Sequence, residues 1–201
     1  MLSKTILRAG MLLVLLAAGQ PSLATVVGDV APSFDLKSID GEPLSLSDYH
    51  GKKVVYLVFW NTWCSYCIKK TPRYKKLEAE FGDRLEIIAV NTGWSDSPAE
   101  IEQYRSHHET NYLLVYDDQE VLTDRYEVHA VPTEFIIDID GIIRYRDRVP
   151  KYVAAHIPDW FQTYKPDKTH GSGGVNACKI DVPPTPTTPD TLAEARFDDP
   201  N

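Results

Sequence analysis

The sequence predicts an α/β domain with helices on both faces of a mixed central sheet. The prediction rests on two observations. Short apolar runs rich in β-branched residues alternate with longer segments that have helical periodicity. Near the end of this alternation, Asp140-Gly141 separates two more apolar runs, which is typical of a hairpin turn. Strands that alternate with helices build a sheet that is covered by helices on both faces.

The chain divides by composition into a leader, a domain and a tail. In residues 1–24, two basic residues precede a short apolar run, and small residues lead up to Ala24. The run is too short to span a bilayer, so we expect a cleaved signal peptide, with an uncleaved membrane anchor as the alternative. Residues 165–201 are rich in Gly and Pro and predict a flexible tail. Residues 25–164 remain as one domain.

Composition limits what the domain can do. The chain has 201 residues, a formal net charge of −8 and 43% hydrophobic residues, which is enough apolar material for one core. Nucleic acid is disfavoured as a partner, because such binding relies on clustered Lys and Arg. Export would place the protein in the periplasm or the extracellular space, where thiols meet an oxidising environment. It would stay anchored to the membrane if the leader is not cleaved.

The first part of the domain predicts a hairpin extension and then the central strand. Residues 28–36 indicate a turn and a short edge strand, and residues 41–47 a hairpin that leads into a brief helical turn. Residues 54–59 are a continuous apolar run that predicts a buried strand. Residues 68–81 carry apolar side chains four positions apart with Lys and Glu between them, as in an amphipathic helix.

The second part of the domain follows the same patterns. Residues 84–90 predict a second buried strand. Ser97 is a good N-cap for a helix that begins with Pro98, carries Glu100 three residues after the cap and runs to about residue 108. The other expected elements are a strand at 112–116, a helix at 118–126, hairpin strands at 134–138 and 142–146, and a closing helix at 153–164.

A Cys-x-x-Cys pair stands where the first long strand runs into the first long helix. The first turn of a helix has unpaired N–H groups and a partial positive charge, which lower the pKa of a thiol from about 8.5 to roughly 3.5–7.5. We therefore predict that Cys64, at the helix start, is the attacking thiolate. Cys67 lies three residues further on the same face and can close onto Cys64 to release a mixed disulfide.

Other uses of this cysteine pair stay open. A zinc site normally needs a second Cys or His pair, but His107 and His108 are adjacent and point in different directions, and Cys178 lies far away in the tail. The pair can also be an inert structural disulfide, and the domain can be a non-catalytic binding module or a metal-delivery protein. We expect no metal, and no cofactor other than a redox-active Cys64–Cys67 disulfide.

The chain resembles the exported thioredoxin-like proteins of the TlpA/ResA type in three motifs. These are Gly28 to Phe34 at the start of the domain, Trp63 to Cys67, and Val131-Pro132-Thr133 before the hairpin. The resemblance covers about residues 27–161 and implies a thioredoxin fold with an N-terminal hairpin extension and a cis peptide bond before Pro132. The substrate groove expected on this basis is formed by Trp63, Ser65, Tyr66, Val131, Pro132 and Thr133.

The chain departs from this family pattern in its most reactive region. Members commonly have a proline between the cysteines, where this chain has Ser65-Tyr66. A tyrosine directly before the second cysteine instead resembles the pattern of periplasmic disulfide isomerases. Lys70 stands where members often have a glutamate, and Val58 stands near the place of the buried aspartate of thioredoxins. Both usual proton acceptors are thus missing, which leaves the direction of electron flow open. The ammonium of Lys70 tunes the thiols by lowering their pKa, or it extends into water and has little effect.

The resemblance implies thiol–disulfide exchange outside the cytoplasm, by reduction of disulfides in exported proteins such as apocytochrome c. A disulfide oxidant or isomerase is the alternative. The expected partners are protein thiols and disulfides and a membrane or periplasmic electron donor. We expect a monomer. Cys178, as an odd cysteine in an exported chain, is either a free thiol or a link between two copies.

Overall fold

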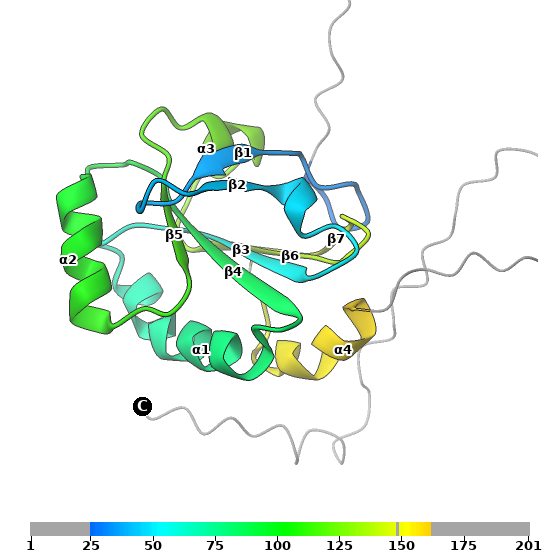
Figure 1. The fold of residues 1–201 in the computed structure, drawn as a ribbon. Helices are drawn as coiled ribbons and strands as arrows, with labels where there is room; N and C mark the ends of the chain where they lie inside the picture. Colours follow the sequence, from blue (N-terminus) through cyan, green and yellow to red (C-terminus); the bar gives the residue numbers. More distant parts are fainter. Residues whose placement is uncertain (1–24, 148, 162–201) are drawn as a thin grey trace, which may run out of the picture.

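A computed structural model of the chain describes residues 25–147 and 149–161, whose arrangement is shown in Figure 1. The expected signal peptide, the expected tail and Cys178 lie outside the described residues. The elements in chain order are β1 (Asp35–Lys37), β2 (Pro43–Ser45), η1 (Leu46–Asp48), β3 (Val54–Trp60), α1 (Ser65–Phe81), β4 (Leu85–Asn91), α2 (Pro98–His108), β5 (Leu113–Tyr116), α3 (Val121–Arg125), β6 (Thr133–Ile137), β7 (Ile143–Asp147), η2 (Lys151–His156) and α4 (Ile157–Trp160).

The centre of the domain is a five-stranded sheet with the strand order β5-β4-β3-β6-β7. β3 is parallel to β4 and β4 is parallel to β5, whereas β6 pairs antiparallel with both β3 and β7. Every residue of β3 is buried, because this strand lies in the middle of the sheet with a layer on each face, and its sequence is therefore continuously apolar. β1 and β2 form a separate antiparallel pair, which confirms the expected N-terminal hairpin.

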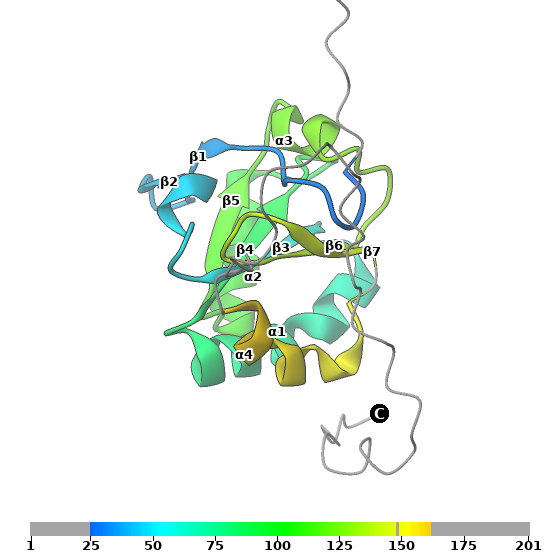
Figure 2. The same cartoon turned by 90° about the vertical axis from the view of Figure 1, so that its right-hand side faces the viewer.

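Two layers cover the sheet. α1, α2 and α4 lie on one face, and the β1–β2 pair lies with α3 on the other, as Figures 1 and 2 show. The side chains of β3 alternate between these layers. Tyr56 and Val58 belong to the apolar cluster under α1, whereas Leu57 and Phe59 belong to the cluster on the opposite face. The predicted α/β architecture, with helices on both faces of a mixed sheet, is confirmed.

The local sequence determines the ends of α2 closely. Ser97 is its N-cap, and the Ser97 Oγ accepts a hydrogen bond from the Glu100 N–H at 3.4 Å. Pro98 occupies the first turn, where its missing N–H costs nothing. Glu109 follows the helix in the left-handed conformation, with a φ of 48°, and ends it. The predicted start and end of this helix are confirmed.

Two expected helices are shorter in the structure. In place of the closing helix at 153–164, a 3-10 segment leads into the single turn α4, because Pro158 has no N–H with which to continue a helical ladder. Residues 162–164 of that expected helix lie outside the described part. The helix expected at 118–126 is only α3, since Glu120 has a left-handed φ of 55° that prevents an earlier start.

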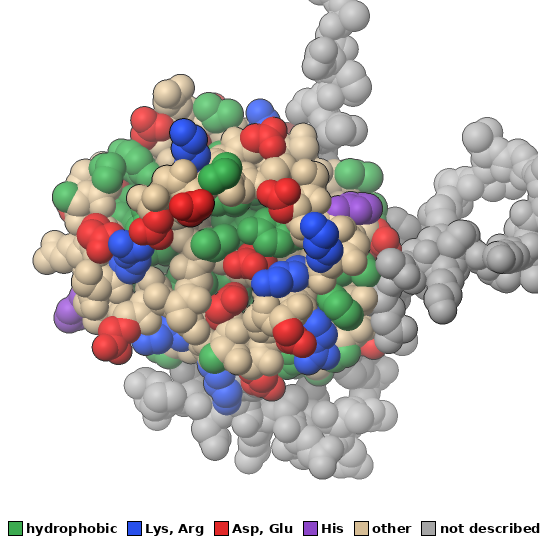
Figure 3. All heavy atoms as spheres, in the orientation of Figure 1, with side chains coloured by type: hydrophobic (Ala, Val, Ile, Leu, Met, Phe, Trp, Pro, Cys, Tyr) green, Lys and Arg blue, Asp and Glu red, His purple; other side chains and the backbone are tan. Residues whose placement is uncertain are grey.

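The face of the molecule in Figure 3 mixes acidic, basic and hydrophobic side chains. Basic side chains do not gather into a stripe on this face, in keeping with the formal net charge of −8. Among the helices in the described residues, none has both the length and the apolar character that crossing a bilayer requires.

Candidate active site

Cys64 and Cys67 form a disulfide at the N-terminus of α1, with their Cα atoms 5.2 Å apart. Cys64 is the N-cap of the helix and has an extended backbone, with a φ of −78° and a ψ of 100°. Its Sγ accepts a hydrogen bond from the Cys67 N–H at 3.1 Å. The sulfur thus takes the place of a capping oxygen, where the helix N–H groups and their partial positive charge stabilise an anion. The predicted position of Cys64 at the helix start is confirmed.

The two buried cysteines lie next to exposed side chains. Both are largely buried, with 6% of Cys64 and 2% of Cys67 exposed. Trp63 and Tyr66, on either side of Cys64 in the sequence, are 56% and 72% exposed, and Ser65 between them is exposed as well. Large exposed aromatic side chains that gather at one place are typical of a binding surface. Trp63 and Tyr66 thus place exposed aromatic surface beside the helix start that Cys64 caps.

The segment before β6 reaches the same end of the sheet as the cysteines. β6 starts at Thr133, which pairs with Phe59, and β3 ends one residue later at Trp60. The Val131–Pro132 peptide bond is cis, as the family resemblance implies. Val131 packs against the apolar cluster that contains both cysteines. The antiparallel pairing of β3 with β6 therefore brings two motifs that are distant in the sequence to one site.

The loop after β4 holds the segment that leads into Cys64. The Asp96 carboxylate accepts a hydrogen bond from the Thr62 N–H at 2.8 Å. It also accepts hydrogen bonds from the side-chain amides of Asn61 and Asn91, at 3.0 and 2.6 Å. Burial raises the pKa of Asp96, but the hydrogen bonds outweigh it and bring the pKa below its ordinary value. A charged carboxylate thus fixes the backbone two residues before Cys64.

A buried carboxylate, not expected from the sequence, lies under α1. Glu134 on β6 is fully buried. Its Oε1 accepts hydrogen bonds from the Tyr56 and Tyr74 hydroxyls, at 2.7 and 2.6 Å. Its Oε2 accepts hydrogen bonds from the Val149 N–H, at 3.3 Å, and from the ammonium of Lys70. The carboxylate is therefore surrounded by donors, as a buried charge must be.

Lys70 points into the protein as well as toward solvent. Its side chain is 27% exposed, and its ammonium forms the ion pair with Glu134. Burial raises the pKa of Tyr56 and of Tyr74 well above the ordinary value, and the negative charge of Glu134 raises both further. Both hydroxyls therefore keep their protons and act as donors to Glu134. The charge of Lys70 is balanced by a carboxylate from another strand.

Sequence reasoning could have found Glu134 from its place in a strand. It begins the hairpin strand expected at 134–138 and is followed there by three apolar residues. Charged side chains are seldom fully buried unless they are paired. The sequence does not predict the partner of Glu134, because Lys70 lies 64 positions away. No local pattern connects the two residues.

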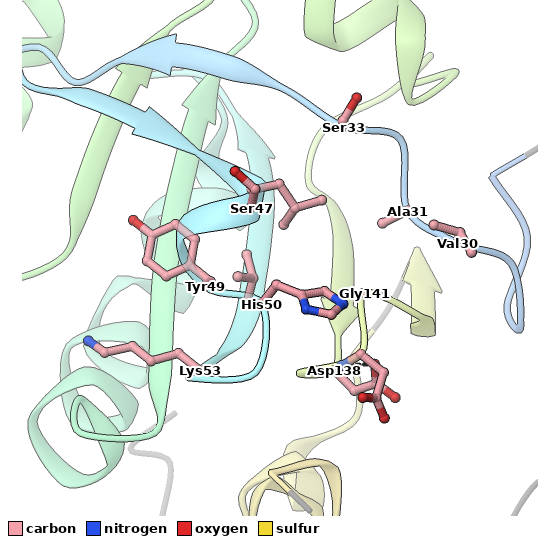
Figure 4. Close-up of a pocket in the computed structure, with 12 residues that line it drawn as sticks. Val30, Ala31, Ser33, Ser47, Tyr49, His50, Lys53, Asp138 and Gly141 are labelled. Atoms are coloured by element: carbon pink, nitrogen blue, oxygen red, sulfur yellow. Dashed lines mark hydrogen bonds between the residues drawn. The ribbon is translucent and has the colours of Figure 1, made fainter. Parts of the chain in front are cut away.

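A pocket of about 190 Å³ lies at the opposite end of β3 from the cysteines, between η1 and the β6–β7 turn (Figure 4). Charged groups that line it already have partners. Lys53 pairs with Glu86 at 2.9 Å, and Asp138 pairs with Arg144 at 2.6 Å. Within the described residues, no group of three or more His, Cys, Asp or Glu side chains is arranged to hold a metal ion. Because the pocket lies at the other end of β3, it is separate from the cysteine site.

The mixed sheet, the disulfide at the start of α1 and the cis proline at the same end of the sheet define a thioredoxin-fold thiol–disulfide oxidoreductase. Residues 27–146 match the model of the AhpC/TSA family, and the chain belongs to this family of thioredoxin-like proteins. The predicted fold class and the predicted enzyme class are both confirmed.

Relatives of known name support the resemblance to the TlpA/ResA type. The chain is 32% identical over 185 residues to the thiol-disulfide oxidoreductase ResA of Bacillus subtilis (strain 168), an alignment that covers 82% of this chain and 96% of the relative. It is 33% identical over 151 residues to ResA of Geobacillus kaustophilus (strain HTA426), covering 70% and 85%. The thioredoxin-like protein YneN of Bacillus subtilis (strain 168) is 36% identical over 118 residues, covering 58% and 68%.

Solved structures agree with the fold. A structure from Chlorobium tepidum, described as a thiol:disulfide interchange protein DsbE, superposes with a TM-score of 0.61 at 26% identity and covers 68% of this chain and 99% of that one. The thioredoxin domain of a thiol-disulfide oxidoreductase from Bacteroides vulgatus has a TM-score of 0.60 at 23% identity, with the same coverage of 68% and 99%. The second similarity concerns the fold alone.

Proposed function

We propose that this chain carries out thiol–disulfide exchange outside the cytoplasm and reduces disulfides in exported proteins. The observation that carries the proposal is the Cys64–Cys67 pair at the N-terminus of α1, with Cys64 as the N-cap. The leader expected at residues 1–24 supports export. The resemblance to the TlpA/ResA type supports the reducing direction, with apocytochrome c, before haem attachment, as one substrate.

The proposed reaction has two steps. The Cys64 thiolate attacks a substrate disulfide, so that a Cys64–substrate S–S bond forms and one substrate thiolate leaves. Cys67 then loses its proton and attacks the Cys64 sulfur, so that the Cys64–Cys67 bond forms and the second substrate thiolate leaves. Two electrons thus pass from the protein to the substrate. A membrane or periplasmic dithiol donor must return them, and no cofactor beyond the disulfide is needed.

The proposed docking surface for substrate lies around the exposed aromatic side chains. Trp63 and Tyr66 supply large apolar area close to Cys64, and the half-buried Val131 and Pro132 supply the other side. Thr133 contributes through its backbone, because its hydroxyl donates to the Ala130 carbonyl at 2.7 Å. The whole proposed groove is Trp63, Ser65, Tyr66, Val131, Pro132 and Thr133.

A disulfide oxidant or isomerase is the second candidate function. Ser65-Tyr66 between the cysteines and the positive Lys70 one turn beyond Cys67 favour it. A cation near a thiolate stabilises the reduced form, and a stabilised reduced form makes the disulfide more oxidising. The two candidate functions therefore differ in the reduction potential that the pair must have.

The reduction potential of the Cys64–Cys67 pair distinguishes the candidates. A reductant is expected near the potential of thioredoxin, about −270 mV, whereas an isomerase or oxidant is expected near about −180 to −120 mV. Equilibration with glutathione or dithiothreitol buffers, read by alkylation of the free thiols, measures it. A pair that never exchanges with model disulfides would instead favour a non-catalytic binding domain, and stoichiometric Cu(I) or Zn(II) binding a metal-delivery protein.

Substitution of each cysteine tests the roles within the pair. Cys67→Ser is expected to accumulate a mixed disulfide on Cys64, because the resolving attack is lost, and the trapped exported proteins can then be identified. Cys64→Ser is expected to abolish exchange with a small disulfide. Faster alkylation of Cys67 than of Cys64 in the reduced wild-type protein would reverse the assignment.

A further inference from the structure

Glu134 lies on the face of the sheet that carries the cysteines. It pairs with Val58 between β6 and β3, and side chains that lie directly opposite each other in a sheet point to the same face. Val58 belongs to the apolar cluster that contains Cys64 and Cys67. A fully buried carboxylate therefore shares the layer between the sheet and α1 with the two sulfur atoms.

α1 reaches Glu134 from the turns that follow Cys67. Lys70 lies three residues after Cys67, and Tyr74 lies four residues after Lys70, a spacing that puts all three on one helix face. The Lys70 ammonium pairs with Glu134, and the Tyr74 hydroxyl donates to it at 2.6 Å. The helix that carries Cys67 in its first turn thus carries the counter-charge of Glu134 in its second.

We propose that the Glu134–Lys70 ion pair sets the charge state of the Cys67 thiol in the reduced protein. The inference rests on the proposed function, since it concerns the step in which Cys67 resolves a mixed disulfide. Cys67 is 2% exposed, and burial disfavours its thiolate. A nearby ammonium favours the thiolate and a nearby carboxylate disfavours it, so the two partners act with opposite sign.

The resolving step needs no reactant other than the mixed disulfide and water. The Cys67 proton leaves to water, and the Cys67 thiolate forms the bond to the Cys64 sulfur. The electron pair of the broken Cys64–substrate bond leaves on the substrate sulfur. While Lys70 is paired with Glu134, the carboxylate offsets part of the electrostatic stabilisation that the ammonium gives to the thiolate. Each partner, when deprived of the other, exerts its full effect.

Other charged and titratable groups face the same network. Burial and the charge of Glu134 raise the pKa of Tyr56 and Tyr74, and the positive charge of Arg73 on α1 opposes them with a smaller effect. Those two hydroxyls stay protonated. Asp147 lies opposite Glu134 on β7, but its side chain is 71% exposed and therefore screened by solvent. The charges that differ most in the test are thus those of Glu134 and Lys70.

Two substitutions separate the partners. In Glu134→Gln the unpaired ammonium of Lys70 is expected to lower the Cys67 thiol pKa by about one unit and to make the disulfide more oxidising. In Lys70→Met the unpaired carboxylate is expected to shift both quantities the other way by a similar amount. The double variant is expected to return close to the wild-type values. Alkylation rates of each thiol against pH and the reduction potential are the measurements.

The matched control is Lys53→Met, which breaks the Lys53–Glu86 ion pair at the far end of β3. This control is expected to leave the thiol titration unchanged. Shifts of the same sign in both single variants, or shifts no larger than in the control, would overturn the proposal and leave the pair a structural one. If a single variant does not fold, the double variant against wild type still gives a result, because a shift of more than about one unit there contradicts cancellation. Thiol titration needs no substrate, so loss of the proposed function is scored separately, by absence of exchange in the wild-type protein.

Discussion

Single acidic residues hold the active-site region in place through several hydrogen bonds each. Asp96 binds the backbone and side chains of the segment before Cys64, and Glu134 binds groups from β3, from α1 and from the segment after β7. A buried acceptor with several donors is costly to remove, because each donor then loses its partner in a place that water reaches poorly. At this scale, substitutions at acids and at close backbone contacts are the sharpest tests.

Asp96→Ala is expected to lower the free energy of unfolding by about 1–3 kcal/mol, because the Thr62 N–H and the Asn61 amide lose a buried acceptor. The pKa of Asp96 is lower in the folded state, so its contribution is complete above the unfolded value of about 3.9 and is lost as the pH falls through the folded pKa. Denaturant titrations at pH 7 and at pH 3 measure both effects. Asp83→Ala, at an acid that is 73% exposed, is the control, and an equal loss in the two variants would contradict the prediction.

Gly93→Ala is expected to destabilise the loop that supports Trp63. Gly93 has a φ of 78°, and a Cβ atom there would lie 2.9 Å from the Asp117 carbonyl oxygen. The next residue, Trp94, accepts a hydrogen bond from the Trp63 indole N–H at 2.8 Å. We expect a loss of about 1–3 kcal/mol from the conformation alone and more from the clash.

The matched control for this loop is Gly41→Ala. Gly41 has a similar φ of 86° but no atom within 4 Å of a Cβ added there, so only the conformational cost applies. Thermal or chemical unfolding of the two variants compares them. Equal destabilisation of both would show that the close approach to Asp117 is relieved at no cost.

At the scale of elements, α1 connects the redox pair to the rest of the domain. It begins at the Cys64 cap, carries the Lys70 and Tyr74 contacts to Glu134 along its length, and continues through Pro72 without ending. Near its C-terminus, the Glu78 carboxylate accepts a hydrogen bond from the Ile87 N–H at 3.1 Å and so ties the helix to β4. These contacts hold α1, and with it the two cysteines, against the sheet.

Glu78 makes the stability of the α1–β4 contact depend on pH. Burial, and then the negative charge of Glu86, raise the pKa of Glu78 from 4.5 to about 7. The folded state therefore binds more protons than the unfolded state between these values, and the stability that Glu78 confers falls as the pH rises from 4.5 to about 7. Glu78→Gln is expected to remove that fall. Free energies of unfolding at pH 5 and pH 8 test it, and parallel pH profiles for variant and wild type would rule it out.

At the scale of the whole molecule, the described domain contains the complete candidate site. The cysteine cap, the cis proline, the Asp96 loop and the Glu134 network all come from residues 56–149. We propose the division into a signal peptide at 1–24, a thioredoxin-like domain at 25–164 and a flexible tail at 165–201. The tail is then expected to serve something other than the exchange chemistry.

Truncation after residue 164 tests this division. Reduction of a small disulfide is expected to stay within about twofold of the intact mature chain, because surface changes outside a site seldom alter it strongly. Cys178→Ser in the full chain is the control, and non-reducing electrophoresis of the intact chain shows whether Cys178 links two copies. Loss of most activity on truncation would mean that the tail, or Cys178 itself, takes part in the cycle.

Features that depend on neighbours along the chain can be predicted without the structure. The strand and helix alternation, the Ser97 cap, the Asp140-Gly141 turn and the Cys-x-x-Cys pair at a helix start are all local patterns, because periodicity and capping act within one or two turns. The overlong helix expected at 153–164 also follows from local reasoning, which gave too little weight to Pro158.

Contacts between groups that are distant in the sequence depend on the three-dimensional fold. Glu134 and Lys70 are 64 positions apart, and Asp96 and Thr62 are 34 apart, so no sequence spacing relates the members of either pair. They meet because β6 pairs antiparallel with β3 and the loop after β4 turns back to the end of β3. A carboxylate is thus placed under α1 from the neighbouring strand, although the usual positions for it in this chain hold Val58 and Lys70. The contact between Glu134 and Lys70 therefore follows from the pairing of β6 with β3, which local sequence patterns do not predict.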